Sequence, residues 1–212
     1  MDGRKFGGFD PESLRLQLRE EDEGKMQQRI ERLQRVRVHK IIPHVWFDFA
    51  STECHDLFRD GHYYGCICLS QSVAEGLAKF ILERHKCKVG KQGRPIESCK
   101  KPATSRGLIK MLKGLKGGVR NGSPMAALSS KCLEAFDRLE GGDRDDFHHL
   151  NRSVTSDRVK LEKRAEECVR ALYDIESELF EFSVSEGGAL IPHQPLYWPD
   201  AGKYARVFLR SS

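Results

Sequence analysis

The feature that most constrains this chain is a seam of small and apolar residues spaced alternately four and three positions apart. Its members are Leu161, Ala165, Cys168, Leu172, Ile175, Leu179 and Phe182. Unbroken spacing of this kind over three heptads is typical of an α-helix that packs lengthwise against other helices. The seam favours packing within a helical bundle and leaves a dimer interface as the alternative.

Helical patterns also occupy most of the chain before the seam. Asp10 as N-cap and Pro11 in the first turn begin a charged helix over 11–38, whose thin apolar stripe suits the surface of a larger body. The segment 62–85 is apolar nearly all round in its first half, which is typical of a central bundle helix. Further helices are predicted at 45–59, 105–116 and 124–139, with a short one starting at Asp143.

These patterns predict an all-α fold. We expect a charged N-terminal helix packed on the bundle within 1–44, a helical domain over 45–184 and a C-terminal tail over 185–212. Alternating residues at 204–210 predict one short strand in the tail, paired with 189–191 or with another subunit. Prolines and glycines at 86–103 predict a loop.

Length and composition limit the class of protein. The 212 residues suit one domain with a real core. No apolar run reaches the length of a membrane span, and Met1 to Asp10 lacks the apolar stretch of a signal peptide. The seven cysteines lie mostly within helical patterns, which favours buried thiols in a reducing compartment. We therefore expect a soluble, cytoplasmic protein that makes no membrane contact.

The basic residues are unevenly distributed. Eleven Lys and Arg face one acid, Glu97, within 86–120, although the net charge of the whole chain is only +5. This basic insert predicts contact with RNA phosphates, and its lack of aromatic residues excludes base stacking from it. The alternative is a solvated loop without a ligand. The predicted RNA-binding residues are Lys91, Arg94, Lys100, Lys101, Arg106, Lys110, Lys113 and Lys116.

Common catalytic and metal-binding motifs are missing from the sequence. It contains no G-x-S-x-G, P-loop or G-x-G-x-x-G motif. His85, Cys87 and Cys99 match no familiar zinc spacing and lack an obvious fourth ligand. We therefore expect neither a metal site nor a cofactor.

The segment from Arg144 to His149 carries the remaining candidate chemistry. Its sequence is Arg-Asp-Asp-Phe-His-His, directly after Gly141 and Gly142. An arginine offers a planar, permanently charged fork that suits phosphate, and a histidine can move a proton near neutral pH. Together they suffice to cleave RNA without a metal, with histidine acting on the ribose 2′-hydroxyl or the leaving oxygen. The alternative is a solvated helix start with two incidental histidines.

At these residues the sequence resembles the HEPN family of helical domains, many of which are ribonucleases. Their signature is an arginine, usually followed by Asn, Asp or His, with a histidine five to seven positions later. Arg144, Asp145 and His149 match it. Two upstream stretches also resemble the family: the run Leu57 to Tyr64, and the apolar helix with a central acid at Ser72 to Leu77. The resemblance covers roughly residues 45–182.

The resemblance implies an up-and-down bundle of four or five helices that forms a homodimer. Two Arg/His pairs would meet in one cleft and act as a metal-independent endoribonuclease, often a toxin held by an antitoxin or a phage-defence effector. Asn151 replaces the tyrosine that antitoxins modify in some toxin members, so that form of control is not expected. The basic insert and the tail lie outside the family pattern.

Two site residues keep alternatives open. We take His149 as the general acid or base and His148 as a helper, although on a regular helix His148 shares a face with Arg144. Glu75 is a candidate to hold Arg144, and its alternative is an ordinary helical pair with Lys79. For the whole chain, the alternatives to a nuclease are a non-catalytic HEPN-like module that binds RNA or a protein, and a helical scaffold whose seam docks another chain.

Overall fold

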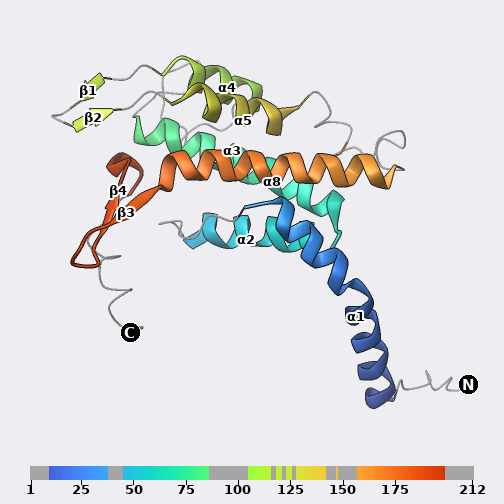
Figure 1. Ribbon diagram of the computed structural model, residues 1–212. Coiled ribbons are helices and arrows are strands. Elements are labelled where there is room, and N and C mark those ends of the chain that lie inside the picture. The colour runs from blue at the N-terminus through green and yellow to red at the C-terminus, as the bar shows by residue number, and fades with distance from the viewer. Residues whose placement is uncertain are drawn as a thin grey trace, which may run out of the picture.

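The computed structural model describes residues 10–37, 45–85, 105–115, 118–120, 123–125, 128–141, 147 and 157–198. Over these ranges the chain forms a helical bundle with two small hairpins (Figure 1). The predicted all-α fold is confirmed.

Helices α2 (Val45–Arg59) and α3 (Tyr63–Arg84) form an antiparallel hairpin. The tight turn between them depends on Gly61, whose φ of 79° lies in the left-handed region that favours glycine. The main-chain N–H of Gly61 donates to Phe58 and that of His62 to Leu57, so the end of α2 is well satisfied. The turn fixes the start of α3 beside the end of α2.

Helix α8 (Arg158–Phe180) runs parallel to α3 through the middle of the molecule. Tyr63 and Glu162 meet near the starts of the two helices, and the rings of Phe80 and Phe180 lie 6.2 Å apart near their ends. The heptad seam faces inward, because Ala165, Cys168, Leu172, Ile175 and Leu179 are buried. Packing within the bundle, rather than a dimer interface, is therefore the confirmed interpretation of the seam.

The prediction that the helical seam extends to Phe182 is wrong. Phe182 does not belong to α8, because the backbone turns extended at Glu181 (φ −65°, ψ 143°) and the next residues form strand β3 (Phe182–Val184).

Helix α5 (Ser130–Glu140) packs antiparallel to α8. The Ser129 N–H donates to Glu178 at one end, and Arg164 donates to the carbonyl of Arg138 at the other. The helices α2, α3, α5 and α8 thus alternate in direction, as in an up-and-down bundle. Helix α4 (Ser105–Lys113) covers α3 and α5 with Leu108 and Leu112 buried beneath it.

The predicted start of α5 at residue 124 is wrong. Strands β1 (Gly118–Arg120) and β2 (Ser123–Met125) form an antiparallel hairpin there. The Ser129 side chain accepts a hydrogen bond from the N–H of Cys132, which makes Ser129 the N-cap of α5. The capping serine therefore fixes the start of the helix after the hairpin.

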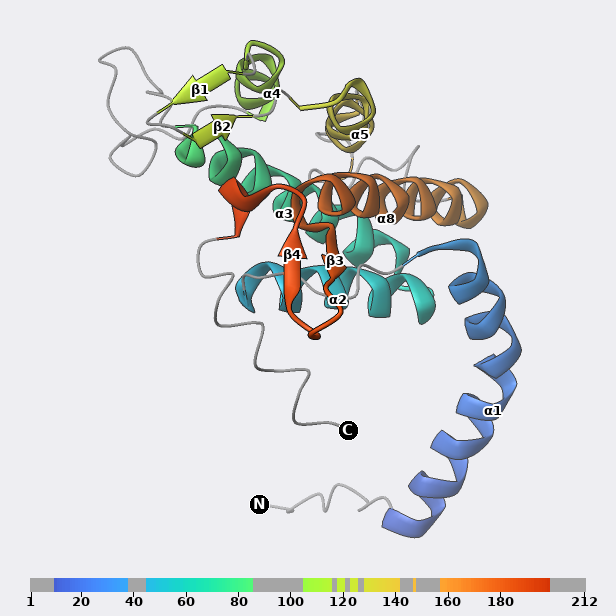
Figure 2. The same cartoon turned by 60° about the vertical axis from the view of Figure 1, so that its left-hand side comes forward.

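Helix α1 (Pro11–Arg35) projects from the bundle, as Figures 1 and 2 show. Its residues from Pro11 to Gln28 are all exposed, whereas Arg32 near its end is only 7% exposed. The Asp10 side chain caps the helix by accepting from the N–H groups of Glu12 and Ser13. Only the last third of this helix docks on the bundle.

The C-terminal part of the described chain folds back onto α3. Strand β4 (Leu190–Pro192) pairs antiparallel with β3, across the predicted boundary at residue 185. A 3₁₀ turn, η2 (Pro195–Tyr197), then buries the Tyr197 ring, whose hydroxyl lies 2.9 Å from Nε2 of His85. The predicted strand at 204–210 lies outside the described residues.

Two further properties of the described residues concern solubility and redox state. Helix α3 is long and apolar enough to cross a membrane, but most of its apolar stretch is buried inside the bundle, as in the core helix of a bundle. Cys54, Cys66, Cys68, Cys132 and Cys168 are all free thiols. Burial raises the pKa of the Cys54 thiol to about 12, so it is an unreactive thiol at neutral pH.

Candidate functional site

The predicted catalytic residues Arg144, Asp145, His148 and His149 lie outside the described residues. Phe147 is described, has helical backbone and is only 2% exposed. Its main-chain carbonyl accepts a hydrogen bond from the Tyr64 hydroxyl, in the first turn of α3. One residue within the motif is therefore anchored to the bundle by both burial and a hydrogen bond.

The predicted supporting residue Glu75 lies on α3, eleven positions beyond Tyr64. Its carboxylate forms an ion pair with Nζ of Lys79 at 2.8 Å, which is the helical pair named above as its alternative role. The proposed contact of Glu75 with Arg144 stays a prediction.

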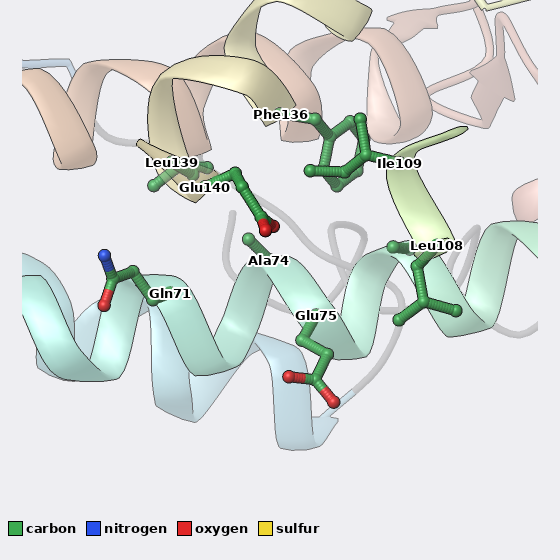
Figure 3. Close-up of a pocket in the computed structure, with 9 residues that line it drawn as sticks. Gln71, Ala74, Glu75, Leu108, Ile109, Phe136, Leu139 and Glu140 are labelled. Carbon is green, nitrogen blue, oxygen red and sulfur yellow. The ribbon is translucent and has the colours of Figure 1, made fainter. Parts of the chain in front are cut away.

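Glu75 also lines a pocket between α3, α4 and α5 (Figure 3). In this view the Glu140 side chain extends from α5 toward Ala74, whereas the Glu75 side chain extends away from α5. The pocket measures about 20 Å³, which is room for about one water molecule. Its walls are mainly apolar, from Ala74, Ala78, Leu108, Ile109, Phe136 and Leu139.

Gln71 is the neutral polar residue that lines this pocket. Its side chain is 4% exposed, and neither Nε2 nor Oε1 has a hydrogen-bond partner among the described residues. A buried carboxamide without partners is costly unless a water or a ligand atom satisfies it. The pocket suits a small polar group beside two carboxylates and is too small for a nucleotide.

The predicted RNA-binding residues are only partly described. Lys110 and Lys113 lie on α4, where Lys110 is exposed and Lys113 forms an ion pair with Asp137 at 2.7 Å. Arg106 lies on the same helix, but its side chain is outside the described part of the chain, and so are the other residues of the set: Lys91, Arg94, Lys100, Lys101 and Lys116.

The candidate zinc ligands are not assembled within the described part of the chain. His85 is buried and contacts Tyr197, while Cys87 and Cys99 fall outside the described ranges. In the ranges that are described, no three His, Cys, Asp or Glu side chains lie in an arrangement that could hold a metal ion.

Two groups of polar residues have no counterpart in the sequence prediction. Arg32 and Arg158 meet over the ring of Tyr63, although 126 positions separate them in the sequence and neither belongs to a motif. Glu176 is fully buried between α8 and α2, and its neighbours in the sequence resemble those of any surface glutamate. Only the packing of distant elements brings the two arginines together and buries Glu176.

The electrostatics of Glu176 follow from its burial. Burial raises the pKa of this carboxyl to about 8; the Ser51 hydroxyl opposes the rise and the charge of Asp48 adds to it. Ser51 lies near enough to favour the ionised form slightly, yet neither carboxylate oxygen forms a hydrogen bond with a described residue. We therefore expect Glu176 to be largely protonated at neutral pH.

Comparison of the chain with protein families, curated proteins and solved structures gave no match. The class that the fold itself defines is an all-α, up-and-down helical bundle with a projecting N-terminal helix.

Proposed function

We propose that this chain is a HEPN-like endoribonuclease that cleaves RNA without a metal. Arg144 and His149 would form the acid-base pair, Asp145 and His148 would assist, and two copies would build one cleft. The observation that carries the proposal is the anchoring of Phe147. This residue lies between Arg144 and His149 in the sequence, is buried, and is held to α3 by the hydrogen bond from Tyr64. Catalytic groups need such a rigid support to hold their geometry.

The proposed reaction is an attack of the ribose 2′-oxygen on the adjacent phosphorus. A histidine takes the 2′-hydroxyl proton, and the leaving 5′-oxygen gains a proton from a second acid, which the other histidine or the partner copy can supply. Arg144 stabilises the charge that develops on the phosphate oxygens. The products are a 2′,3′-cyclic phosphate and a 5′-hydroxyl end, so the reaction needs no water and no metal in this step.

The test compares wild-type protein with Arg144→Ala and His149→Ala in EDTA, using a labelled single-stranded RNA. We expect the wild type to leave 5′-hydroxyl ends and each variant to lose about a hundredfold or more in rate. Arg15→Ala and His193→Ala are matched controls, because both side chains are exposed and lie outside the motif. Cleavage that survives both motif substitutions, or that needs a divalent ion, contradicts the proposal.

The dimer and the biological role need separate measurements. Sedimentation of the wild type at micromolar concentration is expected to give a dimer, and a monomer would contradict the shared cleft. Induced expression of wild type in the cytoplasm is expected to arrest growth, and His149→Ala is expected to be harmless. That pattern is what a toxin or a phage-defence effector, held in check by an antitoxin, would produce.

A second candidate function is a non-catalytic HEPN-like module that binds RNA or a partner protein. The observation that favours protein binding is the exposure of apolar side chains along α1, including Leu16, Leu18 and Met26. Apolar groups on a projecting helix are typical of a surface that meets another chain. Absence of cleavage on any RNA, combined with harmless expression, would favour this function.

A further inference from the structure

Two arginines from distant parts of the chain converge over one tyrosine at the end of the bundle where α3 and α8 begin. Cζ of Arg32 lies 5.4 Å from the ring centroid of Tyr63, and Cζ of Arg158 lies 5.6 Å from it. A β-carbon at Gly61 would lie 3.3 Å from a terminal nitrogen of each arginine. The two guanidinium groups therefore lie close together beside Gly61 in the α2–α3 turn.

The positive charges of this arginine pair are only partly balanced by the protein, through the nearby charge of Glu162 on Arg32. Arg32 is 7% exposed and donates to neutral acceptors, the carbonyl of Arg59 at 2.9 Å and Oε1 of Gln28 at 3.3 Å. Within the described ranges, neither Arg32 nor Arg158 forms an ion pair with a carboxylate. Like charges held this close repel each other, more strongly where water is partly excluded. An anion between them would relieve that repulsion.

The carboxylates around the pair are already engaged. Glu162 accepts a hydrogen bond from the Tyr63 hydroxyl at 2.6 Å and also pairs with Arg35. Burial raises the pKa of Glu162, but these two contacts, together with the charges of Arg35 and Arg32, lower it more, so that it lies below its ordinary value. Asp60 pairs with Arg29 and Arg59, each at 2.9 Å, and Glu31 accepts from Gln27.

The surrounding surface is shaped to admit a ligand. An open groove of about 410 Å³ lies over the pair, lined by Gln28, Glu31, Arg32, Arg35, Arg158 and Glu162. Two guanidinium forks that line one groove suit a tetrahedral anion with several acceptor oxygens better than a single carboxylate.

We propose that Arg32 and Arg158 form a subsite for a backbone phosphodiester of single-stranded RNA. This inference rests on the proposed function, because RNA is the substrate assigned there. Tyr63 supports the arginine pair, and the next residue, Tyr64, holds Phe147 within the candidate motif. A phosphate in the subsite would thus hold an RNA strand beside Tyr63, whose neighbour in the sequence, Tyr64, anchors the motif.

The test measures RNA binding in the His149→Ala background, so that cleavage does not interfere. The probe is a short fluorescein-labelled single-stranded RNA, titrated at several salt concentrations. Arg158→Gln is expected to weaken binding about tenfold at low salt and to reduce the slope of log K against log salt by about 0.7. Arg32→Lys keeps the buried charge but removes the fork, so we expect weaker binding with little change in slope.

Arg15→Gln is the matched control, since it removes the same charge from an exposed position on α1. Wild-type affinity and slope in Arg158→Gln would overturn the subsite, as would an equal loss in Arg15→Gln. Cleavage by the wild type is scored separately. Active wild type with unchanged binding in Arg158→Gln rejects the subsite alone, whereas lost binding with inactive wild type keeps the subsite and rejects the nuclease.

Discussion

The hydroxyl of Tyr64 donates a hydrogen bond to the main-chain carbonyl of Phe147, which joins the first turn of α3 to the segment between α5 and α8. Tyr63 precedes it in the same turn and carries the arginine pair on a different side of the helix. Because adjacent residues of a helix point about 100° apart, a single turn supports both proposed parts of the RNA site.

Replacing Tyr64 by phenylalanine tests the anchor of the motif. The substitution removes the donor and leaves the main-chain carbonyl of Phe147 without its partner, which lowers the free energy of unfolding. We expect RNA cleavage to fall more than this loss of stability explains, because the motif loses its support. Unfolding in urea and initial cleavage rates, both at a temperature where every variant is folded, are the measurements.

Tyr63→Phe is the control for Tyr64→Phe. It removes the hydroxyl of a more deeply buried tyrosine, which donates to Glu162, and it keeps the ring under the arginine pair. A loss of stability at least as large, without the loss of cleavage, is expected. Equal rates in the two variants would show that the Tyr64 hydrogen bond does not position the motif.

The buried carboxyl of Glu176 predicts how stability varies with pH. Burial raises its pKa from 4.5 to about 8 in the folded protein. Between these two values the unfolded chain releases the proton and the folded protein keeps it. The stabilising contribution is therefore complete below pH 4.5 and is lost as the pH rises toward about 8.

Glu176→Gln removes this titration. The variant is expected to gain stability relative to wild type at pH 8, and much less at pH 5, as measured by urea unfolding at each pH. Glu186→Gln, at an exposed turn, is the control that leaves the pH dependence unchanged. Parallel pH profiles for wild type and Glu176→Gln would refute the assignment.

Gly61→Ala tests the turn that supports the arginine pair. The φ of 79° is strained for alanine and costs about 1–2 kcal/mol, and the new β-carbon would press on both guanidinium groups. We expect lower stability together with weaker RNA binding. Gly187→Ala has room for its β-carbon, with Ser185 Oγ nearest at 4.0 Å, and is expected to affect neither property. Unchanged RNA binding in Gly61→Ala would contradict the predicted displacement of the arginines.

Tyr197 connects the C-terminal segment to α3, and two substitutions separate its contributions. Tyr197→Phe removes the hydrogen bond to His85 but keeps the ring beside Phe80, so we expect a loss of about 1 kcal/mol. Tyr197→Ala also removes a fully buried ring, and a loss of about 3–5 kcal/mol is expected. Urea unfolding measures both losses. If they were equal, the ring would contribute nothing to holding the segment.

The sequence predicted the elements whose periodicity extends over many residues. The heptad seam located α8, and the mainly apolar character of 62–85 identified α3 as the central helix. Short elements were poorly predicted, because three-residue strands such as β1 and β2 contain too few positions to show a period. The start of α5 depended on one capping residue, Ser129, which competed with equally plausible starts nearby.

The residues of the candidate site also fall into those that the sequence predicts and those that it does not. Local spacing was enough to single out Arg144 and His149 as a motif. It was not enough to single out Tyr64 as the anchor of Phe147, or to bring Arg32 and Arg158 together. Those contacts join residues far apart in the chain, and only the packing of α1, α3 and α8 creates them.

The projecting helix α1 has a consequence for hydrogen exchange. Most of the stability of a helix in a protein comes from packing of its apolar face, and the residues from Pro11 to Gln28 gain little from the bundle because all of them are exposed. Amide protons there should exchange with solvent far faster than those around Arg32 or within α8. Binding of another chain along α1 would therefore be seen as new protection of amides that are otherwise among the first to exchange.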